Sequence, residues 1–268
     1  MLDFGNMVLA SANPLEHVVA KPLFTFSLWG AKIVISNHIF MLLLATVLLI
    51  LVLPLAVRDK RLVRRGFGNL IETVCVFIRE EVARPFLHDR TDKYIGFIWT
   101  TFFFVLTLNL LGMVPLARII YLLTGRESHL EGAATANIWI TGALALSAFF
   151  MIHISGMREH GFGGYIRNFA PKVPWPMVPF IYLMEIIAAL VKPFSLAIRL
   201  FANIFAGHVV VATIIGLALI FRNITAGFAS VFAAVLLSLL ELFVAFLQAY
   251  IFTFLSTIFI GFAVQPEH

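Results

Sequence analysis

The chain has 268 residues and is strongly apolar: 61% of its residues are hydrophobic and only 12% are charged. Soluble domains are typically ~45–50% apolar and ~25% charged, so this composition excludes an ordinary soluble domain and indicates a membrane protein. The net charge of +5 does not indicate a nucleic-acid partner, because the basic residues gather at the ends of apolar segments. A single cysteine, Cys75, excludes an internal disulfide framework and paired-cysteine chemistry, and we predict no metal and no cofactor.

The N-terminal part of the chain combines an outer segment with a first membrane span. Residues 1–35 form the outer segment, and their start, MLDFGNMVLASANPLEH (1–17), lacks a positively charged region and a long apolar core, so we expect no cleaved signal peptide. The first span lies within residues 36–57, where Ile39–Val57 carries no charge and has about the ~20 residues that a bilayer crossing needs. The basic sequence RDKRLVRRG then opens a loop, residues 58–93, that we assign to the cytoplasm.

The same loop contains the sequence NLIETVCVFIREEVARPFL, residues 69–87, which has a helical pattern of apolar positions. Charged side chains such as Glu72 and Arg79 fall on the opposite side of that helix. The pattern predicts an interfacial amphipathic helix, and a helix packed on a soluble partner is the alternative. The predicted apolar positions are Leu70, Val74, Phe77, Ile78 and Val82.

Two further spans are predicted within residues 94–157. They run from about Tyr94 to Ala117 and from about Asn137 to Met157, and a short, mildly acidic loop joins them. The next loop, residues 158–177, is basic and is therefore assigned to the cytoplasm, which places the N-terminus outside. Two polar residues of these spans, Asn109 and His153, are interpreted as packing or interface groups.

The last two apolar stretches are too long for simple spans. Residues 178–221 and 225–264 would form helices of about 60–65 Å, roughly twice the ~30 Å hydrocarbon core. Either each helix is broken, with Pro193 as a candidate kink, or both are strongly inclined. Because no glycine–proline cluster or charged loop interrupts either stretch, inclination is favoured, with a turn at FRNITAG (221–227) on the outer side.

The predicted fold is therefore an all-α integral membrane protein, in which residues 1–268 form a single membrane domain. It contains three ordinary transmembrane helices, an interfacial amphipathic helix, and a membrane-embedded hairpin of two long, strongly inclined helices, residues 178–264. The C-terminus is placed on the cytoplasmic or matrix side.

Arg199 is the most informative residue of the hairpin. It lies in KPFSLAIRLFANIFAGH, residues 192–208, within an almost uninterrupted apolar run. A guanidinium stays protonated, and placing it at the centre of a bilayer costs at least ~2.5–3.5 kcal/mol. No acid stands three or four residues away, so the sequence predicts a counter-ion elsewhere. A buried ion pair inside the chain, with Glu185 or Glu241, is the alternative.

The other polar residues of the hairpin fall into register with one another. Folding the chain about residue 224 places His208 level with Glu241. It also places Arg199 level with Gln248 on the second helix. Intramembrane Glu and His residues that face each other are typical of proton relays. On the first helix Glu185, Lys192, Arg199 and Asn203 share one side, and on the second helix Ser238, Glu241 and Gln248 do.

The sequences KPFSLAIRLFANIFAGH and ELFVAFLQAY (241–250) closely resemble subunit a of the F-type ATP synthases. The LNLLGMVP segment (108–115) and the basic cytoplasmic loop fit the same family, so the resemblance covers about residues 36–264. The resemblance implies a non-catalytic stator channel subunit in a bacterial plasma membrane or mitochondrial inner membrane. Its implied partners are the c-ring of subunit c and the peripheral-stalk subunit b.

The resemblance also assigns roles to residues of the hairpin. Arg199 would face the essential carboxylate of successive c subunits and separate two aqueous proton half-channels. Asn203 and Gln248 would orient the arginine, His208 and Glu241 would line the outer half-channel, and Glu185 would lie on the cytoplasmic side. Many bacterial relatives carry the acid and the histidine exchanged. The supporting polar residues are Lys192, Ser195 and Ser238.

The competing interpretation is a proton-coupled secondary transporter, which would also bury Arg, Glu and His. Against it, five membrane segments are few, and the sequence has no visible inverted repeat and no broken-helix substrate site.

Overall fold

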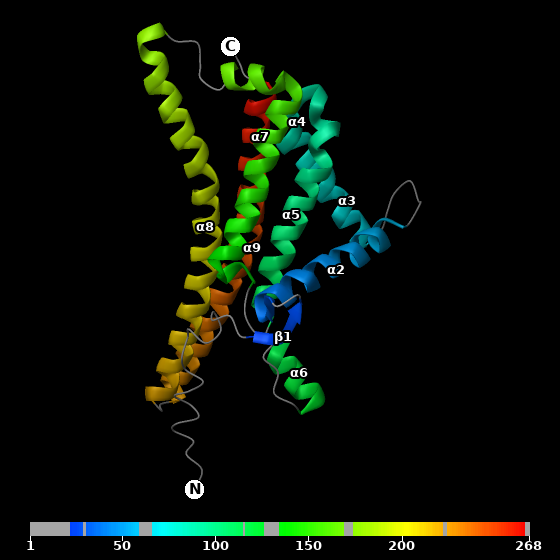
Figure 1. The fold of residues 1–268 in the computed structure, drawn as a ribbon. Coiled ribbons are helices and arrows are strands. Elements are labelled where there is room, and N and C mark those ends of the chain that lie inside the picture. The colour runs from blue at the N-terminus through cyan, green and yellow to red at the C-terminus, as the bar shows by residue number, and fades with distance from the viewer. Residues whose placement is uncertain are drawn as a thin grey trace. The chain divides into compact units, whose positions relative to one another are not determined.

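The computed structural model describes residues 22–28, 31–58, 66–114, 116–125, 134–168, 174–221 and 224–265. These residues form a helical membrane protein with one small β-hairpin (Figure 1). The predicted absence of a signal peptide concerns residues 1–17, and most of the basic sequence RDKRLVRRG is residues 59–65; both lie outside the described residues.

The strands and helices follow the chain in a simple order. Among the described residues, two strands come first and are followed by α-helices with short helical turns between them. The elements are β1 (Pro22–Leu28), β2 (Ala31–Ser36), α2 (Asn37–Val57), α3 (Phe67–Phe77), a π-helical turn (Ile78–Ala83), α4 (Arg84–Leu87), a 3₁₀ turn (His88–Arg90), α5 (Thr91–Met113), α6 (Leu116–Thr124), a 3₁₀ turn (Ala134–Ala136), α7 (Ile138–Asn168), a 3₁₀ turn (Trp175–Met177), α8 (Val178–Phe221) and α9 (Ile224–Val264).

Four described helical stretches are long and apolar enough to cross a membrane. Three of them overlap the predicted ordinary spans, and the fourth lies in α9. Within α8, Val178–Ala189 is a further apolar helical stretch that is shorter than these four. The four stretches are Asn37–Val57, Phe67–Met113, Ile138–Arg167 and Gly227–Val264.

The described residues divide into two compact units. The first comprises residues up to Ala45, Leu106–Ile138 and Arg199–Leu247, and the second comprises Thr46–Val105, Trp139–Ile198 and Gln248 onward. Each of the helices α2, α5, α8 and α9 contributes residues to both units.

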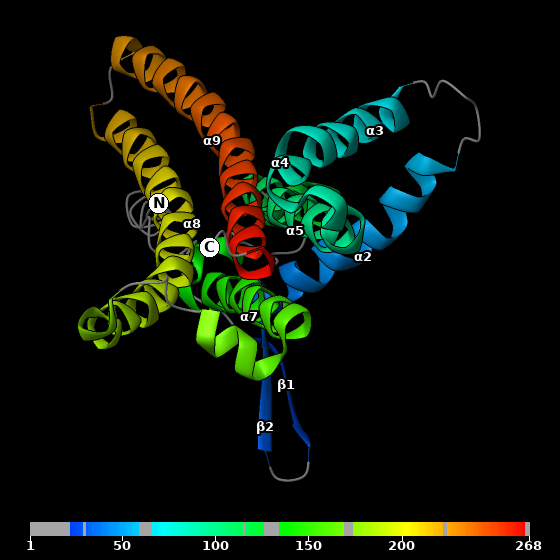
Figure 2. The same ribbon diagram turned by 90° about the horizontal axis from the view of Figure 1, so that it is seen from above.

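An antiparallel hairpin precedes α2 in the first unit, and the sequence did not predict it. Strands β1 and β2 pair with Leu28 opposite Ala31 and Thr25 opposite Val34 (Figure 2). The register shifts between Pro22 and Phe24, as expected next to a proline that has no N–H for the ladder. β-branched and aromatic residues of FTFSL and AKIVIS favour strands, so this part of the predicted outer segment is not helical.

The predicted amphipathic helix is present, but its buried side differs from the prediction. Leu70 and Phe77 are 59% and 46% exposed, whereas Ile71, Ile78 and Val82 are at most 5% exposed. Ile71 and Ile78 are seven residues apart and therefore share one side of the helix, so the buried side includes them, and Leu70 and Phe77 lie on a neighbouring side.

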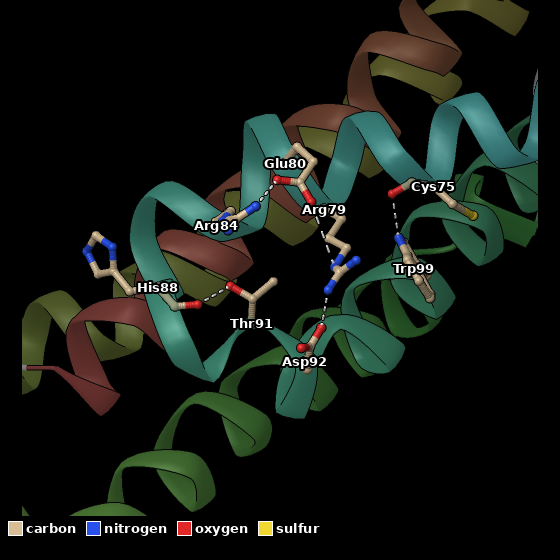
Figure 3. A network of polar contacts seen from close by, with 8 residues as sticks. All are labelled: Cys75, Arg79, Glu80, Arg84, His88, Thr91, Asp92 and Trp99. Atoms are coloured by element: carbon tan, nitrogen blue, oxygen red, sulfur yellow. Dashed lines mark hydrogen bonds and ion pairs between the residues drawn. The ribbon is translucent and has the colours of Figure 1, made fainter.

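The buried side of this helix packs on its own chain in the second unit. Trp99 Nε1 of α5 donates a hydrogen bond of 3.0 Å to the carbonyl oxygen of Cys75 (Figure 3). The Phe86 ring packs edge-on against Phe254 of α9, with ring centroids 5.7 Å apart. Farther along α9, a Cβ on Gly261 would lie 2.8 Å from the Phe86 carbonyl oxygen, so only glycine allows this approach.

The second predicted span is divided into two helices. It was expected to run to Ala117, but α5 ends at Met113 and α6 begins at Leu116. Val114 precedes Pro115 in the sequence, and the residue before a proline disfavours the helical conformation.

A cluster of charged and polar groups of the second unit surrounds Glu159 of α7. Its carboxylate pairs with the Lys93 ammonium, lies 3.0 Å from Arg90 Nη1, and accepts a hydrogen bond of 3.1 Å from the Tyr94 hydroxyl. Arg90 Nη1 and His160 Nε2 each lie 3.0 Å from the carbonyl oxygen of Val264, the last residue of α9. The end of α9 is therefore held by side chains that precede α5 and that belong to α7.

Each of the two long helices is continuous: α8 has 44 residues and α9 has 41 (Figure 1). Pro193 does not end α8, so the alternative of a helix broken at that position has no support. Only residues 222–223 separate the helices, which agrees with the turn predicted at residues 221–227, although these two lie outside the described residues.

Candidate functional site

Arg199 lies on α8 with an exposed side chain, although Ala197 and Leu200 beside it are buried, at 5% and 0% exposure. Across the described ranges, no acidic side chain forms an ion pair with Arg199. The alternative of an ion pair with Glu185 or Glu241 therefore has no support among the described contacts. An apolar helix that presents an exposed guanidinium can receive an anionic group from another molecule.

Glu241 of α9 lies against the backbone of α8 at Gly207, within the first unit. A Cβ added to Gly207 would lie 2.9 Å from Glu241 Oε1 and 3.0 Å from its Cδ. The carboxylate therefore occupies the space that the missing side chain leaves. This contact agrees with the predicted register of the hairpin, in which position 208 is level with Glu241.

The side chains of three predicted site residues of α8 lie outside the described part of the structure. They are Lys192, Asn203 and His208, whose backbone belongs to α8. The predicted pairing of His208 with Glu241 is therefore supported only by the neighbouring contact at Gly207. Of the supporting residues, Ser195 of α8 and Ser238 of α9 are exposed.

Gln248 of α9 is 3% exposed, and its Nε2 has no hydrogen-bond partner within the described residues. Leaving a buried amide N–H without a partner costs about 1–3 kcal/mol, so this position suits a group that takes a partner from water or from another molecule. The predicted level of Gln248 with Arg199 stays a prediction.

Asn109 of α5 is fully buried in the first unit and holds α9 in place. Its Nδ2 donates a hydrogen bond of 3.3 Å to the carbonyl oxygen of Ala245. This contact supports the predicted packing role of Asn109. Ala245 lies one helical turn beyond Glu241, so the same bond fixes the part of α9 that carries the acid.

Glu185 of α8 is half-buried and lies near aromatic residues that sequence reasoning did not single out. Tyr165, at the end of α7, is within electrostatic range of both Glu185 and Tyr182. The Tyr165 hydroxyl also forms a hydrogen bond with His153 Nδ1. His153 thus has a polar partner in addition to the packing role predicted for it, and no sequence spacing indicated Tyr165, because α7 bends at Gly161 before reaching it.

In the part of the chain that the structure describes, no three His, Cys, Asp or Glu side chains gather closely enough to hold a metal ion. The arrangement can instead present a cation, Arg199, on an apolar helix, with carboxylates at Glu241 and Glu185 farther along the same two helices. Such a set can attract an anionic partner and exchange protons with it.

Comparison with known proteins gives a consistent result. The ATP synthase A chain family model matches residues 39–261. Subunit a of Anaeromyxobacter dehalogenans strain 2CP-C is 39% identical over 230 residues, which cover 84% of this chain and 57% of that protein. Subunit a of Myxococcus xanthus strain DK1622 is 39% identical over 239 residues, 87% of this chain and 74% of that protein.

A third relative is ATP synthase subunit a 2 of Prosthecochloris aestuarii, which is 36% identical over 244 residues, 89% of this chain and 71% of that protein. The chain spans a little over half the length of the Anaeromyxobacter relatives, 56–57%.

Proposed function

The chain belongs to the ATP synthase A chain family, and we propose that it is the stator channel subunit of a rotary ATP synthase. In this proposal the chain is not an enzyme by itself. It provides two aqueous half-channels through which protons reach and leave the carboxylates of a c-ring. Family membership across residues 39–261 gives no support to the alternative, a secondary transporter.

The single observation that carries the proposal is Arg199, an exposed cation on an apolar helix with no acidic partner across the described residues. A cation in hydrocarbon needs an anion, and the proposed anion is the c-ring carboxylate. The guanidinium binds each deprotonated carboxylate by charge-assisted hydrogen bonds and keeps the two half-channels apart. Asn203 and Gln248 are proposed to orient it.

The two half-channels are proposed to lie on opposite sides of Arg199 along α8. Glu241 and His208 line the outer half-channel, and the contact of Glu241 with Gly207 supports their shared level. Glu185 belongs to the cytoplasmic half-channel. Lys192, Ser195 and Ser238 supply polar groups along these paths.

The placement in the membrane follows from the same proposal. The α8–α9 hairpin lies strongly inclined, because helices of 44 and 41 residues are about twice as long as the hydrocarbon core is thick. The N-terminus is outside and the C-terminus is on the cytoplasmic or matrix side of a bacterial plasma membrane or mitochondrial inner membrane. The helix α3–α4 lies at the cytoplasmic surface, and the peripheral-stalk subunit b is a further partner.

Substitution of Arg199 tests this function. In inverted vesicles that contain the whole complex, Arg199→Ala should reduce ATP-driven proton pumping by at least about 100-fold, as loss of a preorganised charge does in active sites. The matched control is Arg84→Ala, which removes an exposed guanidinium paired with Glu80 and should leave pumping unchanged. Substantial coupled pumping by an assembled Arg199→Ala complex would contradict the proposal.

A further inference from the structure

The end of α7 folds back on itself in the second unit. Gly161 adopts φ 70° and ψ 163°, a conformation that is essentially restricted to glycine, and it separates two helical parts. The reversal brings the Tyr165 ring onto Gly156, where an added Cβ would lie only 2.4 Å from Tyr165 Cε2. Glycines at both positions are therefore needed to seat this ring.

The seated ring places the Tyr165 hydroxyl on His153. The hydroxyl forms a hydrogen bond with His153 Nδ1, and the imidazole packs edge-on against Phe149 with ring centroids 4.0 Å apart. Glu185 and Tyr182 of α8 also act electrostatically on the Tyr165 hydroxyl. His153, Tyr165 and Glu185 are all half-buried, so they are neither fully solvated nor sealed from water.

These three groups have the chemistry of a proton path. A carboxylic acid can release a proton, a phenol hydroxyl can accept one while donating its own, and an imidazole can take up a proton at Nδ1 and release another from Nε2. We propose that Tyr165 and His153 are proton-relay residues that continue the cytoplasmic half-channel from Glu185. This inference rests on the proposed function.

The relay conserves protons at each step. The Glu185 carboxyl gives its proton to a water molecule, that water gives a proton to the Tyr165 oxygen, and the Tyr165 hydroxyl proton passes to His153 Nδ1. Glu185 is then a carboxylate, Tyr165 is again a neutral phenol, and His153 is an imidazolium. The imidazolium releases its Nε2 proton to water, and exchange of ring protons with water restores the starting tautomer.

The same hydrogen bond would be present if it only held the end of α7 in place, so the test must separate a structural role from a proton-relay role. His153→Gln keeps an acceptor for the Tyr165 hydroxyl, and therefore keeps the structural hydrogen bond, but its amide cannot take up a proton. Tyr165→Phe keeps the ring on Gly156 and removes only the hydroxyl. The matched controls are His160→Gln, whose imidazole contacts the Val264 carbonyl, and Tyr94→Phe, whose hydroxyl contacts Glu159.

The experiment measures ATP-driven proton pumping by the whole complex in inverted vesicles, in H₂O and in D₂O. Both relay variants should pump about 100-fold more slowly, which is the lower end of what positioned acid–base groups contribute. Their solvent isotope effect should also rise, because proton transfer becomes rate-limiting. Both control variants should pump at the rate of the parent complex, because their side chains lie outside the proposed path.

Pumping by His153→Gln at the rate of His160→Gln, with an unchanged isotope effect, would overturn the relay. If the Tyr165→Phe complex fails to assemble, the pumping rate of His153→Gln alone decides between the relay and a structural role. An Arg199→Ala complex measured in parallel separates the two proposals. If Arg199→Ala pumps normally, the proposed function fails, whereas an inactive Arg199→Ala complex beside normal relay variants refutes only the relay.

Discussion

Adding a methyl group at Gly207 should slow proton transport without unfolding the protein. The new Cβ would lie 2.9 Å from Glu241 Oε1, against an ordinary contact of about 3.4 Å. The carboxylate must therefore move by about 0.5 Å. Because this atom is the end of a flexible side chain, the movement costs no more than the lower end of the ~1–3 kcal/mol typical of overpacking.

The effects of Gly207→Ala on stability and on transport should separate. Alanine is more favourable than glycine in a helix by about 1 kcal/mol, which offsets most of the packing cost. The complex should therefore assemble with a nearly unchanged melting temperature. A misplacement of ~1 Å in a reacting group can cost ~100-fold in rate, so a shift of ~0.5 Å should slow pumping roughly tenfold.

The assay compares Gly207→Ala with Gly227→Ala, a substitution on α9 where an added Cβ meets no atom within 4 Å. Pumping is measured in inverted vesicles, and assembly is measured by the melting temperature of the purified complex. Shortening the acid with Glu241→Asp in the Gly207→Ala background should recover part of the rate, giving a non-additive cycle. Equal pumping by the two glycine variants would refute the reasoning.

Three further predictions concern other parts of the chain. Gly161→Ala should destabilise the complex by about 1–3 kcal/mol, seen as a lower melting temperature, because φ 70° with ψ 163° strains any residue with a Cβ; an unchanged melting temperature would contradict this. Glu159→Gln should cost only about 1 kcal/mol in urea unfolding, and less in 1 M salt, because its partner Lys93 is 52% exposed. Exchanging His208 and Glu241 together should recover a clear fraction of the pumping that either single exchange loses, since each single variant leaves two acids or two imidazoles side by side; a double variant as slow as the worse single would show that they do not act as a pair.

The sequence was sufficient to predict the structure wherever a long uncharged run of residues determines it. The first predicted span, Ile39–Val57, differs from α2 by two residues at its start, because the bilayer thickness fixes how long such a run must be. The hairpin turn could also be predicted, since 221–227 is the one polar stretch between two apolar runs. A turn at that position determines which residues are level, and the contact between Gly207 and Glu241 agrees with it.

The parts that the sequence did not predict depend on backbone conformation rather than on composition. The π-helical turn at Ile78–Ala83 interrupts the amphipathic helix, and no residue type specifies such a turn. Likewise, Tyr165 contacts His153 only because Gly161 reverses the chain between them. For Lys192, Asn203 and His208, the predicted roles stay predictions.

The fastening of the last helix has a mechanical consequence. Arg90 and His160 reach the same Val264 carbonyl oxygen from two different parts of the chain. A force along α9 therefore acts on both hydrogen bonds at once, so each bond carries only part of it. The end of α9 is released only when both bonds break. Arg90 is itself braced by Glu159. In the proposed stator function, these two bonds hold the C-terminal end of α9 still while its other end takes the load.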